Sequence, residues 1–171
     1  AGSQIPENQR SEIDKELEKI SLFVWEELQA SNMDQELHES YLDLAVGTGS
    51  LLIEEGDITS PLKFTAIPQS QLTLAAGPYG MVDKIYRSRE MRVADIEIMW
   101  PKAKIPEEMR RLATDKPSKT FPILECVIRD WKNKKTEHHN FYVITPEHQD
   151  IIYNDSFSGD GANPLVAFRW S

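Results

Sequence analysis

Gly47-Thr48-Gly49 is the stretch whose residue types and spacing most resemble a cofactor site. A strand, a glycine loop and a helix, in that order, would hold S-adenosylmethionine as in class I methyltransferases. Such a site also needs an acidic residue about 20 positions later. Here the segment before the glycines has a helical period, Gly56 and Pro61 interrupt the one after, and residues 63–70 contain no acid. The pattern therefore favours a helix-to-strand corner, with the glycines ending the helix, and leaves a methyltransferase as the enzymatic alternative.

His138, His139, His148 and Asp150 have side chains that could bind a metal ion. Adjacent histidines on a strand point to opposite faces of the sheet, so His138 and His139 are poorly placed to share one ion. We expect solvated polar residues there, with no metal and no cofactor.

Cys126 is the only cysteine, which excludes a disulfide within the chain. It lies in the apolar run FPILECVI, where a buried and unreactive thiol is expected. No nucleophile has a base in its local sequence, although a catalytic triad can be assembled in space from distant residues. We expect no catalytic residues and do not expect an enzyme.

Two helices are predicted at the N-terminus. Residues 7–30 carry apolar side chains at steps of three and four, at Ile13, Leu17, Ile20, Val24 and Leu28. Residues 31–46 form the second helix, with Asn32 as a plausible N-cap. The short connection predicts an antiparallel helical hairpin spanning 7–48.

The region 49–171 is mainly β, because its apolar residues alternate with a period of two. Two short helices, 92–100 and 105–115, interrupt it, and GPYG (77–80) reads as a turn. The strands are predicted at 50–55, 62–68, 71–76, 81–91, 120–131, 138–146, 149–155 and 164–170, with a flexible SFSGDGAN before the last. The fold class is α+β, with a mainly antiparallel sheet or small barrel in a single domain, 1–171.

The strand 81–91 places Asp83, Arg87 and Arg89 on one face. Asp83 and Arg87 are roughly 13 Å apart along a strand, so each should pair with a neighbouring strand instead of with the other. The basic RDWKNKK (129–135) could contact phosphate, but a solvated hairpin loop is the favoured interpretation.

Charge is unevenly distributed along the chain, whose net charge is −9. Residues 1–60 carry 14 acids and three bases, whereas residues 61–171 carry 14 acids and 16 bases. A general nucleic-acid binder should show a basic face, and none is evident. An acidic protein that lets DNA pass without gripping it remains compatible with this balance. No apolar run is long enough to span a membrane.

Four motifs, in order, resemble the bacteriophage head-to-tail connecting (portal) family of short-tailed phages. They are a helix running into the GTG turn and an apolar–acidic strand (31–57), GPYGMVDKIYRSREM (77–91), RVADIEIMWP (92–101) and PLVAFRW (164–170). The family positions matched here are Gly47, Thr48, Gly49, Gly80, Asp83, Arg87, Arg169 and Trp170.

The resemblance implies a structural virion protein that forms a ring, usually of twelve copies, at one vertex of the capsid. DNA would enter and leave through the ring without sequence-specific binding, and capsid, terminase and tail proteins would be its partners. Expected locations are the portal vertex and, during assembly or as a prophage product, the host cytoplasm.

The resemblance also implies an N-terminal, wing-like fragment that lacks the stem, clip and crown. We therefore expect an exposed apolar patch on the helical hairpin. A generic α+β interaction module unrelated to virions is a further alternative.

Overall fold

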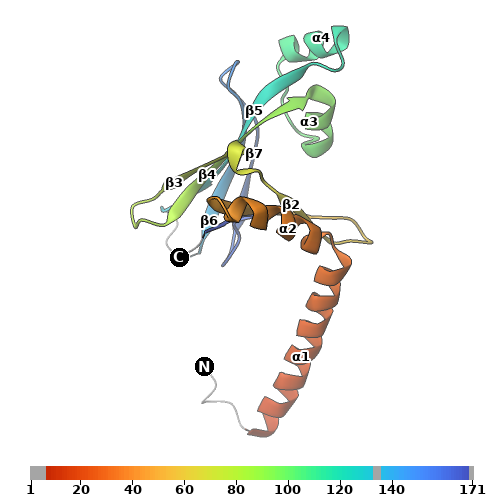
Figure 1. Cartoon of the computed structure of the whole chain (residues 1–171), viewed down its shortest axis with the longest axis vertical. Coiled ribbons are helices and arrows are strands. Elements are labelled where there is room, and N and C mark those ends of the chain that lie inside the picture. The colour runs from red at the N-terminus through yellow and green to blue at the C-terminus, as the bar shows by residue number, and fades with distance from the viewer. Residues whose placement is uncertain (1–6, 133–135, 170–171) are drawn as a thin grey trace.

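The computed structural model describes residues 7–132 and 136–169 (Figure 1). The helices are α1 (Glu7–Ala30), α2 (Met33–Leu44), α3 (Val93–Met99) and α4 (Glu107–Asp115), with a 3-10 turn, η2 (Gln69–Gln71). The strands are β1 (Thr48–Glu55), β2 (Leu62–Ala66), β3 (Leu72–Ala76), β4 (Val82–Arg92), β5 (Thr120–Arg129), β6 (His138–Thr145), β7 (Asp150–Ser158) and β8 (Leu165–Arg169). The predicted α+β class is confirmed.

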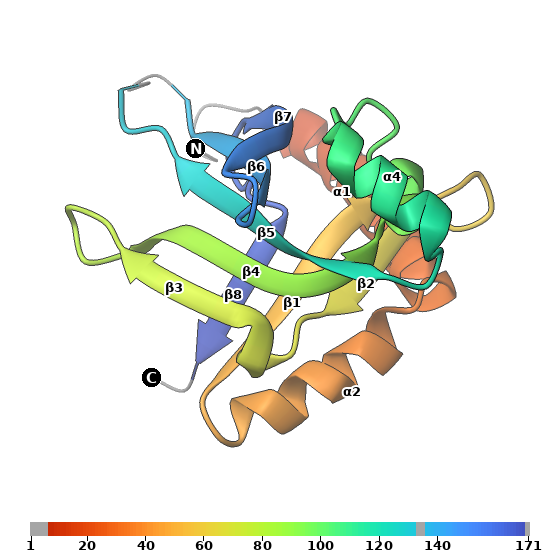
Figure 2. The same ribbon diagram turned by 90° about the horizontal axis from the view of Figure 1, so that it is seen from above.

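The strands form two antiparallel sheets. Sheet A has the order β2-β1-β8, and sheet B has the order β3-β4-β5-β6-β7. Neither sheet closes on itself, so the predicted antiparallel sheet is confirmed and the barrel alternative is wrong. Figure 2 shows the strands of sheet A crossing those of sheet B at a large angle, which leaves two separate sheets facing each other.

One face of sheet B, here called the inner face, carries both apolar cores. Alternation along the strands places Ile85 and Val127 opposite each other on this face, and these residues pack with Leu52 and Leu165 of sheet A. Further along the same face, α3 and α4 cover a second cluster. Its members are Met91, Val93, Ile96, Trp100, Ile105, Met109, Phe121, Ile123, Val143 and Ile152.

The two N-terminal helices are present as predicted, but they do not pack side by side. Figure 1 shows α1 leading away from the rest of the molecule, whereas α2 lies against sheet A. The Asn32 amide accounts for this difference. It donates to the Phe64 carbonyl (2.8 Å) and accepts from the Phe64 amide (2.9 Å) on β2, so it does not serve as the predicted side-chain cap. Glu36 accepts from the Ala66 amide at 2.6 Å and fastens α2 further.

The segment after residue 155 also differs from the prediction. The sequence indicated a flexible SFSGDGAN, but β7 continues through its first three residues because Ser158 pairs with His138. Positive φ angles at Gly159 and Gly161 then turn the chain toward β8. The GPYG turn is confirmed, with the Gly80 amide bonded to the Gly77 carbonyl and Gly80 at φ 76°.

A buried ion network lies between the two apolar cores on the inner face. Glu125 of β5 sits opposite Arg87 of β4 in the register. Its carboxylate lies 2.5 Å from Arg89 Nε and 4.0 Å from Arg87 Nη1. Burial raises the pKa of Glu125, and the charges of Arg89 and Arg87 oppose that rise. Burial also lowers the pKa of Arg87, so both partners bear a cost of desolvation, which their mutual attraction and the hydrogen bond from Arg87 Nε to Gln71 (3.1 Å) offset.

Replacing Glu125 with Gln should therefore destabilise the fold, because Arg87 and Arg89 would lose their counter-ion inside the protein. We expect Glu125→Gln to lower the free energy of unfolding by roughly 3 kcal/mol in urea titrations. Glu90→Gln is the matched control, since Glu90 is exposed on β4 and should change stability by less than about 0.5 kcal/mol. Equal effects of the two substitutions would contradict the assigned role of Glu125.

Candidate assembly interface

The glycine pair lies at a helix-to-strand corner. Helix α2 ends at Leu44, the Gly47 amide donates to the Asp43 carbonyl (3.0 Å), and β1 begins at Thr48. This order is helix–glycine–strand, the reverse of the strand–glycine–helix order that a methyltransferase loop requires. Among the described glycines only Gly80, Gly159 and Gly161 have positive φ, so the corner does not use a left-handed cap.

Gly49 is required for close packing. A Cβ there would lie 2.6 Å from the Phe168 ring of β8 and 2.9 Å from the Ser40 carbonyl of α2. Gly47 is less constrained, because its Cβ would meet only the flexible end of Gln69. The corner therefore brings α2, β1 and β8 together around a residue that has no side chain.

Asp83 and Arg87 have partners outside their own strand, as predicted. The Trp131 indole donates to Asp83 Oδ2 at 2.6 Å, and Arg87 lies 4.0 Å from Glu125 of β5. Lys84, next to Asp83 on β4, also lies 3.5 Å from Asp83 Oδ1. Arg129 lies over the Trp131 ring, 4.2 Å from its centroid. Any side chain at Gly77 would collide with the Asp83 carboxylate. These contacts hold the β3–β4 turn against the end of β5, which is a structural role.

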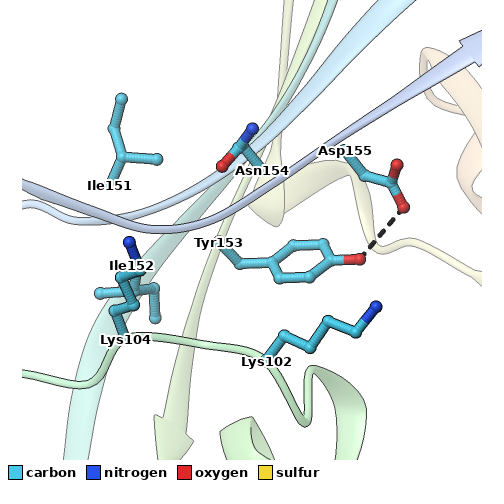
Figure 3. A pocket seen from close by; sticks show the side chains of 7 residues that line it. All are labelled: Lys102, Lys104, Ile151, Ile152, Tyr153, Asn154 and Asp155. Atoms are coloured by element: carbon cyan, nitrogen blue, oxygen red, sulfur yellow. Dashed lines mark hydrogen bonds between the residues drawn. The ribbon is translucent and has the colours of Figure 1, made fainter.

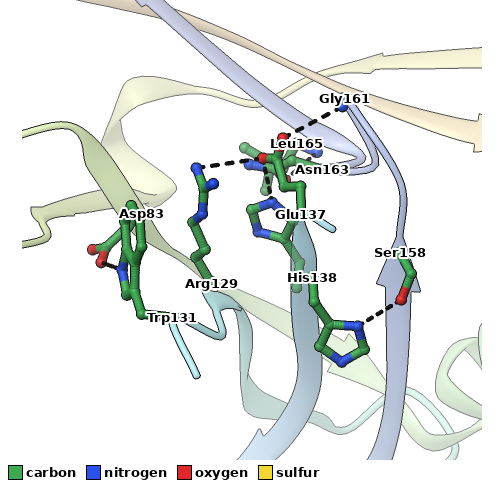
Figure 4. Close-up of polar contacts among 10 residues, drawn as sticks. Asp83, Arg129, Trp131, Glu137, His138, Ser158, Gly161, Asn163 and Leu165 are labelled. Atoms are coloured by element: carbon green, nitrogen blue, oxygen red, sulfur yellow. Dashed lines mark hydrogen bonds and ion pairs between the residues drawn. The ribbon is translucent and has the colours of Figure 1, made fainter. Parts of the chain in front are cut away.

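The two adjacent histidines occupy successive positions of β6 and therefore point to opposite faces, as predicted. Figure 4 shows His138 beside Ser158, and Glu137 near Arg129 and Gly161. His138 Nδ1 contacts the Ser158 hydroxyl at 2.5 Å, whereas the buried His139 places Nε2 2.8 Å from Glu137. Glu137 also lies 3.7 Å from Arg129 and accepts from the Gly161 amide at 3.4 Å. The His139 contact lowers the pKa of Glu137. Within the described ranges, no three His, Cys, Asp or Glu residues are grouped as a metal site.

A polar hollow of about 340 Å³ lies beside β7 (Figure 3). Lys102 and Lys104 reach it from the loop after α3, and the Tyr153 hydroxyl donates to Asp155 at 3.1 Å. Burial, followed by the contact with Asp155, raises the pKa of Tyr153. The lining therefore combines two cations, an acid and a phenol at an open polar surface.

Cys126 is buried on β5, where burial and then the charge of Glu125 raise the pKa of its thiol to about 11. A reactive cysteine needs a lowered pKa, because the thiolate is the nucleophile. This thiol has the opposite shift, which supports a structural interpretation.

The most unusual surface lies on α1. Its apolar side chains are exposed, including Leu17 (54%), Phe23 (61%) and Trp25 (57%). Ile13, Ile20, Leu22 and Val24 are also exposed, so the second half of the helix is apolar on several sides. The exposed patch predicted for the helical pair is therefore confirmed. A surface of this kind marks a site where another molecule binds.

The structure places Gly47, Thr48 and Gly49 at one corner, whereas Gly80, Asp83 and Arg87 lie on or near β4. These two groups do not form one site. Arg169 ends β8 opposite Thr48, and Trp170 lies outside the described residues, as do positions 133–135 of the basic loop. Sequence reasoning missed Glu125, and its signal was a lone carboxylate inside the apolar run PILECVI.

These observations place an exposed apolar surface on a projecting helix (Figure 1), and the glycine corner, the histidines and Cys126 in contacts that hold the fold together. The family model described as bacteriophage head to tail connecting protein matches residues 2–171, and no curated protein matches the chain. The chain therefore belongs to the bacteriophage head-to-tail connecting family. Membership gives it a structural role at the junction of phage head and tail, in contact with capsid and tail proteins in the virion. No helix in the described part is long and apolar enough to cross a membrane.

Adding one methyl group at the corner should destabilise the protein more at Gly49 than at Gly47. We expect Gly49→Ala to lower the free energy of unfolding by about 2 kcal/mol, because the Phe168 ring and the Ser40 carbonyl must both move. Gly47→Ala is the matched control and should cost less than half as much, because the Gln69 side chain can change rotamer. Urea unfolding of both variants measures this difference, and a larger loss for Gly47→Ala would refute it.

Alkylation should report the environment of Cys126. With the pKa of the thiol raised from 9.0 to about 11, the thiolate fraction at pH 8 falls roughly one hundredfold. Iodoacetamide should therefore label native Cys126 at least about a hundredfold more slowly than in urea, with the native rate rising up to about pH 11. Labelling of the native protein as fast as in urea would contradict the buried, unreactive thiol and support a reactive Cys126.

Proposed function

We propose that the chain is part of a portal ring, through which phage DNA is packaged and ejected and to which the tail attaches. The exposed apolar surface of α1 carries this proposal. Side chains such as Phe23 and Trp25 are exposed in the single chain and would leave water in an assembly. The family match supplies the head-to-tail context for that assembly.

Burying the exposed apolar side chains of α1 in a subunit contact would contribute a substantial favourable free energy to assembly. Fully burying one large apolar side chain is worth about 1.5–3 kcal/mol, and α1 exposes seven of them. Association of two chains loses translational and rotational freedom, so only part of this energy would appear as affinity. That remainder supports subunit contacts that repeat around a closed ring.

The distribution of charge is compatible with DNA passing through such a ring. Helices α1 and α2 are acidic, and the net charge of the chain is −9. An acidic surface repels the phosphate backbone and would favour passage over tight binding. Terminase during packaging and the tail afterwards are the proposed partners in addition to the capsid.

The residues shared with the family have structural roles in this proposal, and none is catalytic. Gly47, Thr48 and Gly49 would form the α2–β1 corner, and Arg169 would end β8 beside it, whereas Trp170 lies outside the described residues. Gly80, Asp83 and Arg87 would hold β4 against its neighbours. A soluble enzyme using the glycine loop has no observation that favours it, because a helix precedes the glycines and a strand follows them.

Negative-stain electron microscopy of the complete protein tests this proposal. We expect closed rings with a central hole, twelve subunits being the expected number. Particles should persist over a range of salt concentration, because the contacts on α1 are mainly apolar. Finding only monomers and dimers at every protein and salt concentration would overturn the proposal.

A further inference from the structure

Sheet B has an outer face that no described helix covers. Both apolar cores lie on the inner face, and α2 packs against sheet A. The cross-strand register assigns Tyr86, Cys126, Tyr142 and Asn154 to one row of the outer face. The next row holds Ser88, Leu124, Ile144 and Ile151.

This outer face is unusually apolar for a solvated surface. An antiparallel sheet with one face in water normally carries polar residues on that face. Here the apolar or aromatic positions on the outer face are Tyr86, Leu124, Ile128, Tyr142, Ile144 and Ile151. Only Ile151 among them is exposed, at 56%, and the others are half-buried. A layer packed on top would complete their burial.

Helix α1 and the outer face lie on opposite sides of one copy. Gly49 and Leu51 of β1 face α2, whereas Leu52 faces sheet B. The layers therefore follow the order α2, sheet A, sheet B and outer face. Helix α1 continues from α2 and leads away from the sheets (Figure 1), so it lies apart from the outer face of its own chain.

The two surfaces match in length, and the outer face does not share the strong negative charge of α1. The 24 residues of α1 extend about 36 Å, and the ten residues of β5 extend about 33 Å. Helix α1 holds seven acids and three bases, so pairing with another α1 would bring like charges together. The charged strand positions of the outer face are Lys84, Glu90 and Arg92, and the two bases already lie beside Asp83 and Asp95. The outer face therefore avoids the like-charge repulsion that a second α1 would bring.

We propose that α1 of one copy packs on the outer face of sheet B of a second copy. This inference rests on the proposed ring, which it deepens by naming the two surfaces that meet. Each copy then donates one α1 and receives another, through two different patches. A contact of this kind is heterologous and closes into a ring when the rotation between neighbours allows it.

Disulfide trapping tests the contact directly in the complete protein. Cys126→Ser removes the native thiol, and Val24→Cys then places one on α1. Separate preparations, also without the native thiol, carry Asn140→Cys, Leu124→Cys or Ile144→Cys on the outer face. Their chains have a tag of a different size. After mixing and mild oxidation, we expect a disulfide between differently tagged chains for at least one of these pairs. Lys63→Cys, exposed on β2 of sheet A, is the matched control and should yield none.

The outcome of trapping is decisive in either direction. Cross-links no more abundant than with Lys63→Cys would overturn the inference, as would efficient linking of Val24→Cys to itself. A disulfide confined to mixtures of α1 and outer-face variants would support it, because neither preparation alone contains both thiols.

A second variant separates this inference from the proposed function. Leu17→Glu with Val24→Glu should raise the protein concentration needed for half-assembly at least about tenfold, because two charges would enter an apolar contact. Glu26→Gln, about 180° around α1 from Leu17, is the matched control and should assemble normally. Normal assembly of the double variant would overturn the α1 contact and leave the ring intact. Failure of the unaltered protein to assemble would overturn the ring itself.

Discussion

The inner face of sheet B is the constraint on which the rest of the structure depends. This face must bury two apolar cores, one beneath sheet A and one beneath α3 and α4. Between them, Glu125 is held by Arg87 and Arg89 across the β4–β5 pair. A slip of one residue in this register would turn the charged side chains outward and the outer-face residues inward. The ion network therefore specifies the alignment that both cores require.

Local patterns predicted most elements of the fold, because each has a clear period. Alternation in 81–91 indicated β4, and Pro101 and Pro106 marked the limits of α3 and α4. Contacts between distant residues were not predictable in the same way. The bonds of Asn32 to Phe64 decide that α2 lies on sheet A, and no local signal encodes them. The division into two open sheets likewise depends on the partners that each strand finds.

The sequence predicted the apolar face of α1, but it did not predict that this face is exposed. The helical period showed that α1 has an apolar face, yet the same period suits a core helix and an interface helix equally well. Only the tertiary structure shows that nothing in the described chain covers Leu17 or Trp25. Exposed apolar area on a projecting helix, together with a family defined by connecting head and tail, makes assembly the simplest account of this surface.

Hydrogen–deuterium exchange on α1, in dilute protein and in assembled particles, tests the central claim most directly. The account predicts rapid exchange of the α1 amides in the dilute chain, because the helix lacks tertiary support, and much slower exchange after assembly. The amides of β4 and β5 should exchange slowly in both states and serve as the internal reference. Equal exchange of α1 in the two states would contradict the claim that this helix forms a subunit contact.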